Sequence, residues 1–334
     1  MAEQQQQEQK QQEQQKQEMQ QEMQQVTVCI PTMRRFKPFL ARSVPCYLCM
    51  PGVDRVVICD ETGEDAAEIA AQIWGSHEKL HVRVNTRQLG ALGNKMECVR
   101  LAHSLAAAQN KNSQGCWVAL IDSDNSATDA HYFAPWRAWF AEHKHQRNIK
   151  SIICAPGTAC VDRGGGSETI MTSRSFTNYK QLDITNTGSA MHGSRQAFQL
   201  MNNGNFIVHS SAYIRELSHP IIRQMAALEP MTAYDAAVKL VQLIIDGCIL
   251  QVVPDMAYTH AVHPGSLVIQ REQTAWKRDH AIFNAVFWLC ITMQHSHNDA
   301  RAAHPMFKPT PLPPPDRMTT GNPSPPTLAD EAWL

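Results

Sequence analysis

The sequence predicts an α/β fold in which helices cover both faces of a mostly parallel sheet. Short apolar runs rich in β-branched residues alternate with helical stretches, which is the pattern of wound parallel sheets. Polar residues stand at the ends of the first runs: Thr32, Asp60, Asn85 and Asp122. Because ligands bind outside the carboxyl ends of strands in open α/β sheets, we expect the binding site at that shared edge.

The first half of the chain sets out this alternation element by element. Strands are expected at 26–32, 54–60, 81–85 and 116–121, and helices at 39–47, 64–74 and 96–109. Acids at the start of the second helix suit the positive end of its dipole. A Gly-containing loop at 90–95 is expected to open the third helix. Strand connections of this kind favour right-handed crossovers within one sheet.

The second half has a looser pattern. Strands are expected at 151–155, 204–209 and 249–253, helices at 232–246 and 274–293, and loops at 162–172 and 260–267. Gly247 is expected to cap the first helix at its C-terminus, and Pro254 to close the strand that follows. The final helix is expected to pack in the core, with an interfacial position as the weaker alternative.

Composition separates a globular middle from two polar ends. Residues 1–25 are almost all Gln and Glu and residues 299–334 are rich in proline, so we expect both to be disordered. The net charge of −1 argues against nucleic acid as a partner. No signal peptide or membrane-spanning segment is evident, which predicts a cytoplasmic protein with reduced cysteines and leaves peripheral membrane association open.

Asp122 and Asp124 stand directly after an apolar strand, with one residue between them. Carboxylates placed in this way can hold a hard cation, Mg²⁺ or Mn²⁺, which can in turn hold a diphosphate. A solvated turn is the alternative. An EF-hand loop is excluded, because Ala127 stands where Gly is needed and Phe133 where Glu is needed. A haloacid-dehalogenase phosphatase is excluded too, since it needs Thr or Val at the position of Asn125.

The order of these motifs resembles that of the family 2 glycosyltransferases, whose fold is called GT-A and has three α/β/α layers. The matching segments are Val28–Arg34, Asp60, Gly90–Lys95, the DXD motif Asp122-Ser123-Asp124, Asn203–Phe206, Asp235, Val253-Pro254 and His263–Ser266. The resemblance spans 26–293 and implies one GT-A domain at 26–298. Its nucleotide-binding half would be 26–125 and its acceptor-binding half 150–298.

The resemblance implies a role for each matching residue. A nucleotide-diphospho-sugar would contact Thr32, Arg34, Asp60, Gly90, Lys95, Asp122, Ser123 and Asp124. Mn²⁺ or Mg²⁺ would be held by Asp122 and Asp124, with His263 as a further ligand and His260 as a weaker candidate. Asp235 would be the general base. The family usually has Glu-Asp at this position, whereas this chain has Tyr234-Asp235.

These roles imply a metal-dependent, inverting glycosyltransferase, a hexosyltransferase or related enzyme. It would move a sugar from the nucleotide donor to a hydroxyl of a glycan, lipid or protein acceptor, with the metal as Lewis acid and Asp235 as base. One alternative is a degenerate GT-A domain that binds a sugar or nucleotide without turnover. Another is a sugar nucleotidyltransferase on a related fold, although Pro31–Arg35 lacks the Gly of its basic loop.

Several candidates also have a purely structural interpretation. Asp60 can cap the helix that follows its strand. Lys95 can be a solvated side chain near a helix start, and Asp235 can be an exposed acid in the first turn of its helix. His260 and His263 can be ordinary structural histidines. The sequence alone leaves these alternatives open.

Overall fold

The computed structural model describes residues 25–109, 115–127, 131–162, 169–172, 181–182, 205–217 and 246–261, with positions 220, 222–223, 238–239 and 242–243. Asp235 and His263 lie outside the described residues, as do both polar ends of the chain and the expected helix at 274–293. Within the described part, no helix is both long enough and apolar enough to cross a membrane.

The described strands form one mixed sheet. They are β1 (Val26–Thr32), β2 (Val53–Asp60), β3 (Leu80–Val84), β4 (Trp117–Leu120), β5 (Asn125–Ser126), β6 (Ile152–Asp162), β7 (Thr169–Thr172), β8 (Gln181–Leu182), β9 (Phe206–His209) and β10 (Ile249–Ala261). Their order is β3-β2-β1-β4-β9-β6-β10-β5, with β7 beside β6 and β8 beside β10.

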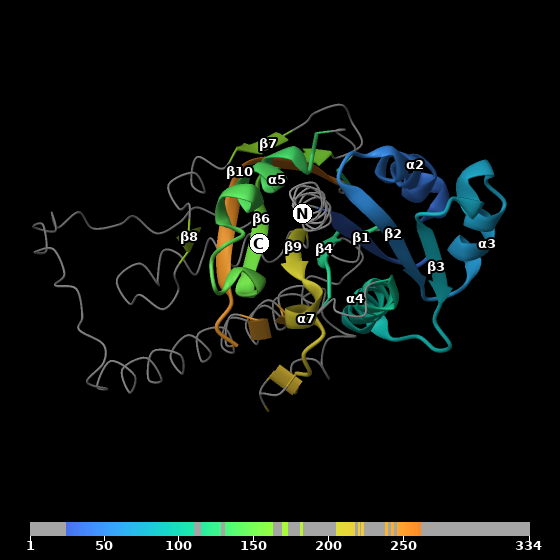
Figure 1. Cartoon of the computed structure of the whole chain (residues 1–334). Helices are drawn as coiled ribbons and strands as arrows, with labels where there is room; N and C mark the ends of the chain where they lie inside the picture. Colours follow the sequence, from blue (N-terminus) through green and yellow to red (C-terminus); the bar gives the residue numbers. More distant parts are fainter. Residues whose placement is uncertain are drawn as a thin grey trace, which may run out of the picture.

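The main strands of this sheet share one direction. β3, β2, β1 and β4 pair in parallel. β9 runs antiparallel between β4 and β6, so β6 has the direction of β4, and β10 is parallel to β6. The antiparallel strands are short or lie at the margin of the sheet. The predicted mostly parallel α/β fold is therefore confirmed (Figure 1).

Helices cover both faces of the sheet. The helical segments are a π-helical turn (Phe36–Leu40), α2 (Ala41–Cys49), α3 (Glu64–Ala70), a 3₁₀ turn (Ile73–Ser76), α4 (Gly90–Gln109), α5 (Ala134–His143), a second 3₁₀ turn (Ile149–Ser151) and α7 (Ser210–Tyr213). Figure 1 shows α4 and α7 on the lower side of the sheet and α2 on its upper side.

Alternate residues of one strand feed two separate cores, as the two-residue period of a strand requires. Val28 and Ile30 of β1 pack with side chains of α2 and α5. Cys29, between them, packs with α4 and with Tyr213 of α7. The central part of the sheet is thus buried on both faces, which explains why β1 and β4 are almost continuously apolar. This arrangement gives the three layers expected of the fold.

Three local expectations were wrong. The loop expected at 162–172 contains strand β7, which pairs antiparallel with β6. Gly90–Lys95 is not a loop, because these residues already form the first turns of α4. Pro254 does not close its strand either. β10 continues to Ala261 across a register irregularity between Val253 and Ala257, and an irregularity of this kind tolerates a proline because the ladder N–H is not needed there.

Candidate functional site

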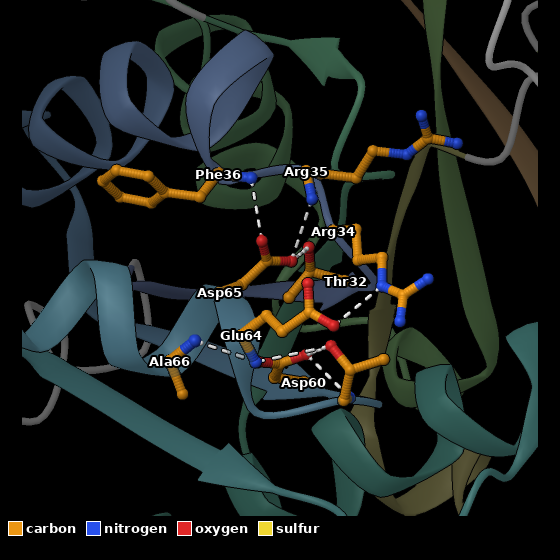
Figure 2. A network of polar contacts seen from close by, with 9 residues as sticks. Thr32, Arg34, Arg35, Phe36, Asp60, Glu64, Asp65 and Ala66 are labelled. Carbon is orange, nitrogen blue, oxygen red and sulfur yellow. Dashed lines mark hydrogen bonds and ion pairs between the residues drawn. The ribbon is translucent and has the colours of Figure 1, made fainter.

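The turn after β1 is organised by Asp65, a buried residue in the first turn of α3. The Thr32 hydroxyl donates to Asp65 Oδ2 at 2.5 Å, and the backbone N–H groups of Arg35 and Phe36 donate to the same carboxylate at 3.0 and 2.9 Å (Figure 2). One carboxylate therefore fixes both the end of β1 and the start of the π-helical turn. Sequence reasoning took Asp65 only as a dipole partner and missed this role.

Arg34 lies within that turn in a strained backbone conformation. Its φ is 59°, in the left-handed region that side chains other than Gly seldom adopt. Its Nε donates to Glu64 Oε1 at 2.9 Å, and both side chains are more than half exposed (Figure 2). The hydrogen bonds to Asp65 fix the residues on both sides of Arg34 and so maintain its strained conformation. The Arg34 guanidinium lies on the solvent side of the strand ends. Strain of this kind is concentrated at functional sites.

Asp60, at the end of β2, is fully buried and holds the start of α3. Its Oδ1 accepts hydrogen bonds from the Thr62 backbone N–H at 3.0 Å and hydroxyl at 3.3 Å, and its Oδ2 accepts the Ala66 N–H at 2.9 Å. The Ala66 bond satisfies a helix N–H that has no intrahelical partner. Asp60 therefore caps the N-terminus of α3, as its structural interpretation predicts.

Asn94 ties three strand ends together from α4. Its Nδ2 donates to the carbonyls of Thr32 at 3.3 Å and Cys59 at 3.0 Å, and its Oδ1 accepts from Asn85 Nδ2 at 2.9 Å. Asn94 is 2% exposed. Sequence reasoning missed it, because a single Asn near a helix start carries no distinctive signal.

Lys95 of α4 forms an ion pair with Asp122, the first acid of the DXD motif, which follows the end of β4. Lys95 Nζ lies 2.6 Å from Asp122 Oδ1, and the two side chains are 4% and 29% exposed. The solvated interpretation of Lys95 is therefore wrong. The Asp122 N–H donates to Asn205 Oδ1 at 3.1 Å, which connects β4 to the residue before β9. The motif thus joins a buried cation to a partly open carboxylate.

Oxygen atoms of several kinds gather around the motif. Ser123 and Asp124 follow Asp122 and are partly exposed. Next to them, the Asn125 amide is buried without a hydrogen-bond partner among the described residues. Burial, with the Asp122 carboxylate and Tyr132 nearby, raises the pKa of Tyr258 well above its usual value, so its hydroxyl stays neutral.

This donor set suits a hard cation. Two carboxylates and one orphaned amide oxygen are ligands of the kind that Mg²⁺ and Mn²⁺ prefer. No group of three or more His, Cys, Asp or Glu with metal-site geometry occurs within the described ranges. His263 lies outside them, and at position 260 the backbone of β10 is paired with Asn125 of β5.

The described candidates lie along one edge of the sheet. Thr32 and Asp60 are register partners in β1 and β2, and the Asn94 and Lys95 contacts bring the start of α4, with Gly90, to the ends of β1, β2 and β4. The edge predicted from the sequence therefore exists. Asp235 is not placed by the structure.

Comparison with known proteins supports the fold. No protein-family model matches the chain, and no curated protein matches it. Among solved structures, TarS 1–349 of S. aureus in complex with UDP-GlcNAc has a TM-score of 0.51 at 13% identity, and the match covers 82% of this chain and 69% of TarS. GalNAc-T7 with UDP, GalNAc and Mn²⁺ has a TM-score of 0.47 at 11% identity, covering 84% and 52% of the two chains. The chain has the GT-A fold, in agreement with the resemblance found in its sequence.

Proposed function

We propose that the protein is a metal-dependent, inverting glycosyltransferase that uses a nucleotide-diphospho-sugar. The observation that carries the proposal is the Lys95–Asp122 pair at the carboxyl ends of the strands of a GT-A fold. Beside it are Asp124 and the buried Asn125 amide, which has no hydrogen-bond partner in the described part of the chain. A buried lysine and a partly exposed carboxylate form a polar centre that the core alone does not require. Ligands of α/β sheets bind at this edge.

In this proposal each residue has a task at the leaving group. Asp122 and Asp124 hold Mn²⁺ or Mg²⁺, which when bound acts as a Lewis acid on the diphosphate. Lys95 holds the Asp122 carboxylate in position and places a fixed positive charge at the same point. Arg34 meets the donor from the turn after β1, supported by Thr32 through Asp65. Asp60 shapes the pocket through α3 rather than through its own carboxylate.

The acceptor side of the proposal rests on the sequence. Asp235 takes the proton of the acceptor hydroxyl, and His263 completes the metal ligands. Residues 26–125 bind the donor and residues 150–298 bind the acceptor. The TarS structure holds UDP-GlcNAc, so the search for the donor starts with UDP-sugars. We propose a hexosyl group as the group transferred.

The test combines turnover with two isosteric variants. We expect the protein to hydrolyse one member of a panel of nucleotide sugars when Mn²⁺ is added and to stop when EDTA is added. Asp122→Asn is expected to weaken Mn²⁺-dependent UDP binding, measured by calorimetry. Asp235→Asn is expected to keep that binding and lose transfer. UDP binding without hydrolysis of any donor would favour a degenerate binding module, and normal transfer by Asp235→Asn would refute the base assignment.

A further inference from the structure

A polar cleft lies beside the strand-end site. It opens between the segment that follows β3 and one side of α4, and its volume is about 480 Å³. The α4 residues that line it include Gly93, Glu97 and Arg100. At 3.6 residues per turn these positions lie about 140–160° around the helix from Lys95, and Met96, which also lines the cleft, lies about 100° from it. The cleft therefore opens mainly on the side of α4 away from the Lys95–Asp122 pair, and it meets the strand-end edge at Asn85.

The cleft is strongly basic. Arg83, Arg87 and Arg100 line it, and Glu97 is the one acid among the described residues that do so. Glu97 holds two of the guanidinium groups, with Arg83 Nη1 at 2.8 Å from Oε1 and Arg100 Nη1 at 3.5 Å from Oε2. Each guanidinium has five N–H donors, so most donors of these two arginines are left for a ligand.

The segment Asn85–Leu89, which forms one wall of the cleft, is held in place by hydrogen bonds. The Leu89 N–H donates to Glu61 Oε2 at 3.0 Å, and Asn85 at the other end of the segment is bonded to Asn94 of α4. Gly93 allows the segment to approach the helix closely, because a Cβ at that position would lie 2.8 Å from Leu89 Cβ. The segment from Asn85 to Leu89 is thus anchored at both ends.

We propose that this cleft binds a small phosphorylated organic molecule. The guanidinium groups of Arg83, Arg87 and Arg100 bind the phosphate, since planar guanidinium forks match phosphate oxygens. Leu89 and Met96, which also line the cleft, contact the organic part. The volume of about 480 Å³ exceeds what a bare phosphate fills and falls within the range of small-molecule sites. The proposal does not depend on glycosyl transfer.

Calorimetry on the full chain tests it, with glycerol 3-phosphate and inorganic phosphate as probes. Arg83→Gln and Arg87→Gln are each expected to weaken binding of glycerol 3-phosphate about tenfold or more, because each removes hydrogen bonds to a charged group. Arg147→Gln, which changes an exposed arginine outside the cleft, is the matched control and should bind normally. Glycerol 3-phosphate should bind more tightly than inorganic phosphate if the apolar wall contributes.

The same experiment separates the cleft from the donor site. UDP with Mn²⁺ should bind the Arg87→Gln variant as tightly as the wild type, and UDP should not displace glycerol 3-phosphate. If UDP displaces it, or if Arg87→Gln weakens UDP to the same extent, the cleft is part of the donor site and the proposal is wrong. Equal affinity of wild type and both arginine variants for glycerol 3-phosphate also overturns it. Circular dichroism melting checks that each variant is folded.

Discussion

Two strand ends of the same sheet carry acids, yet the acids do different things. At the end of β2, Asp60 is fully buried and both its oxygens accept hydrogen bonds from Thr62 and Ala66. At the end of β4, Asp122 keeps 29% of its side chain exposed and pairs with the buried Lys95. The hydrogen-bond acceptors of Asp60 are occupied mainly by the backbone that follows it. Asp122 is instead bound by the Lys95 side chain and remains partly accessible to solvent.

The element that follows each strand explains the difference. α3 begins only a few residues after Asp60, so the orphan N–H groups of its first turn lie within reach of the carboxylate. The two-residue strand β5 follows Asp122 instead, and its backbone is occupied by pairing with β10. An acid at a strand end is therefore a stronger functional candidate when no helix starts next to it.

Among the variants that test this comparison, we expect the replacement of Asp60 to lower the free energy of unfolding most. Asp60→Asn presents an N–H₂ group to backbone donors in a buried place, and we expect it to lower the free energy of unfolding by about 3 kcal/mol. Asp124→Asn, the matched change at the other strand end, should cost less than about 0.5 kcal/mol, as partly exposed positions usually do. Urea denaturation measures both. Equal losses in the two variants would contradict the comparison.

A smaller effect is expected from Lys95→Met. Removing one partner of a buried ion pair is costly, but the partly exposed Asp122 can be hydrated, so we expect a loss of about 2 kcal/mol, below the usual range. Lys95→Arg keeps the charge and serves as the control. A double-mutant cycle with Asp122→Asn should show that the two residues are coupled. Additive losses would mean that the pair contributes no interaction of its own.

The parallel half of the fold was predictable because its signals are local. Each of the first three strands was found within one residue of its observed bounds. For β1 and β2 the reason is that buried parallel strands are short apolar runs between polar ends. The end of β4 also pointed to Asp122 and Asp124, whose role as metal ligands stays a prediction. The pairing of Lys95 with Asp122 could not be predicted from the sequence. It depends on the packing of α4, which begins at Gly90 and so includes Lys95.

The other half depended on contacts between distant segments. β10 extends through Pro254 to Ala261 because β6 supplies a long parallel partner across the irregularity. β7 forms where a loop was expected because it pairs antiparallel with β6. The structural acid Asp65 and the tie formed by Asn94 were missed for the same reason. Their partners, such as Thr32 and Cys59, are tens of positions away along the chain.

The strand-end acids must be compared at a pH at which the rest of the fold is unchanged, and His209 is one group that limits this range. Burial, with Lys150 and His103 nearby, lowers the pKa of His209 to about 3. The unfolded chain takes up this proton near pH 6.5 and the folded chain does not, so the contribution of His209 to stability is fully present above pH 6.5 and falls as pH decreases toward 3. The slope from this group is at most about 1.4 kcal/mol per pH unit.

His209→Phe tests that origin, because it keeps a ring beside Trp117, whose centroid lies 5.4 Å from that of His209. It loses the contact of 2.7 Å between His209 Nδ1 and Ser211 Oγ. We expect the melting temperature of the variant to change less between pH 7 and pH 5 than that of the wild type. An unchanged pH dependence would assign the acid instability to other groups, and the strand-end variants would then need to be compared above pH 7.

The smallest expected effect concerns the exposed pair next to Asp65. Arg34 and Glu64 are 68% and 58% exposed, and solvent-exposed ion pairs contribute little. Glu64→Gln should therefore change the free energy of unfolding by less than about 0.5 kcal/mol, whereas Asp65→Asn, one residue along, should cost several times more because Asp65 fixes the turn after β1. Urea denaturation separates them. A large loss of stability in Glu64→Gln would mean that the Arg34–Glu64 pair, and not Asp65 alone, holds Arg34 in its strained conformation. In the turn after β1, as at the end of β4, contacts between side chains would then organise this edge of the sheet.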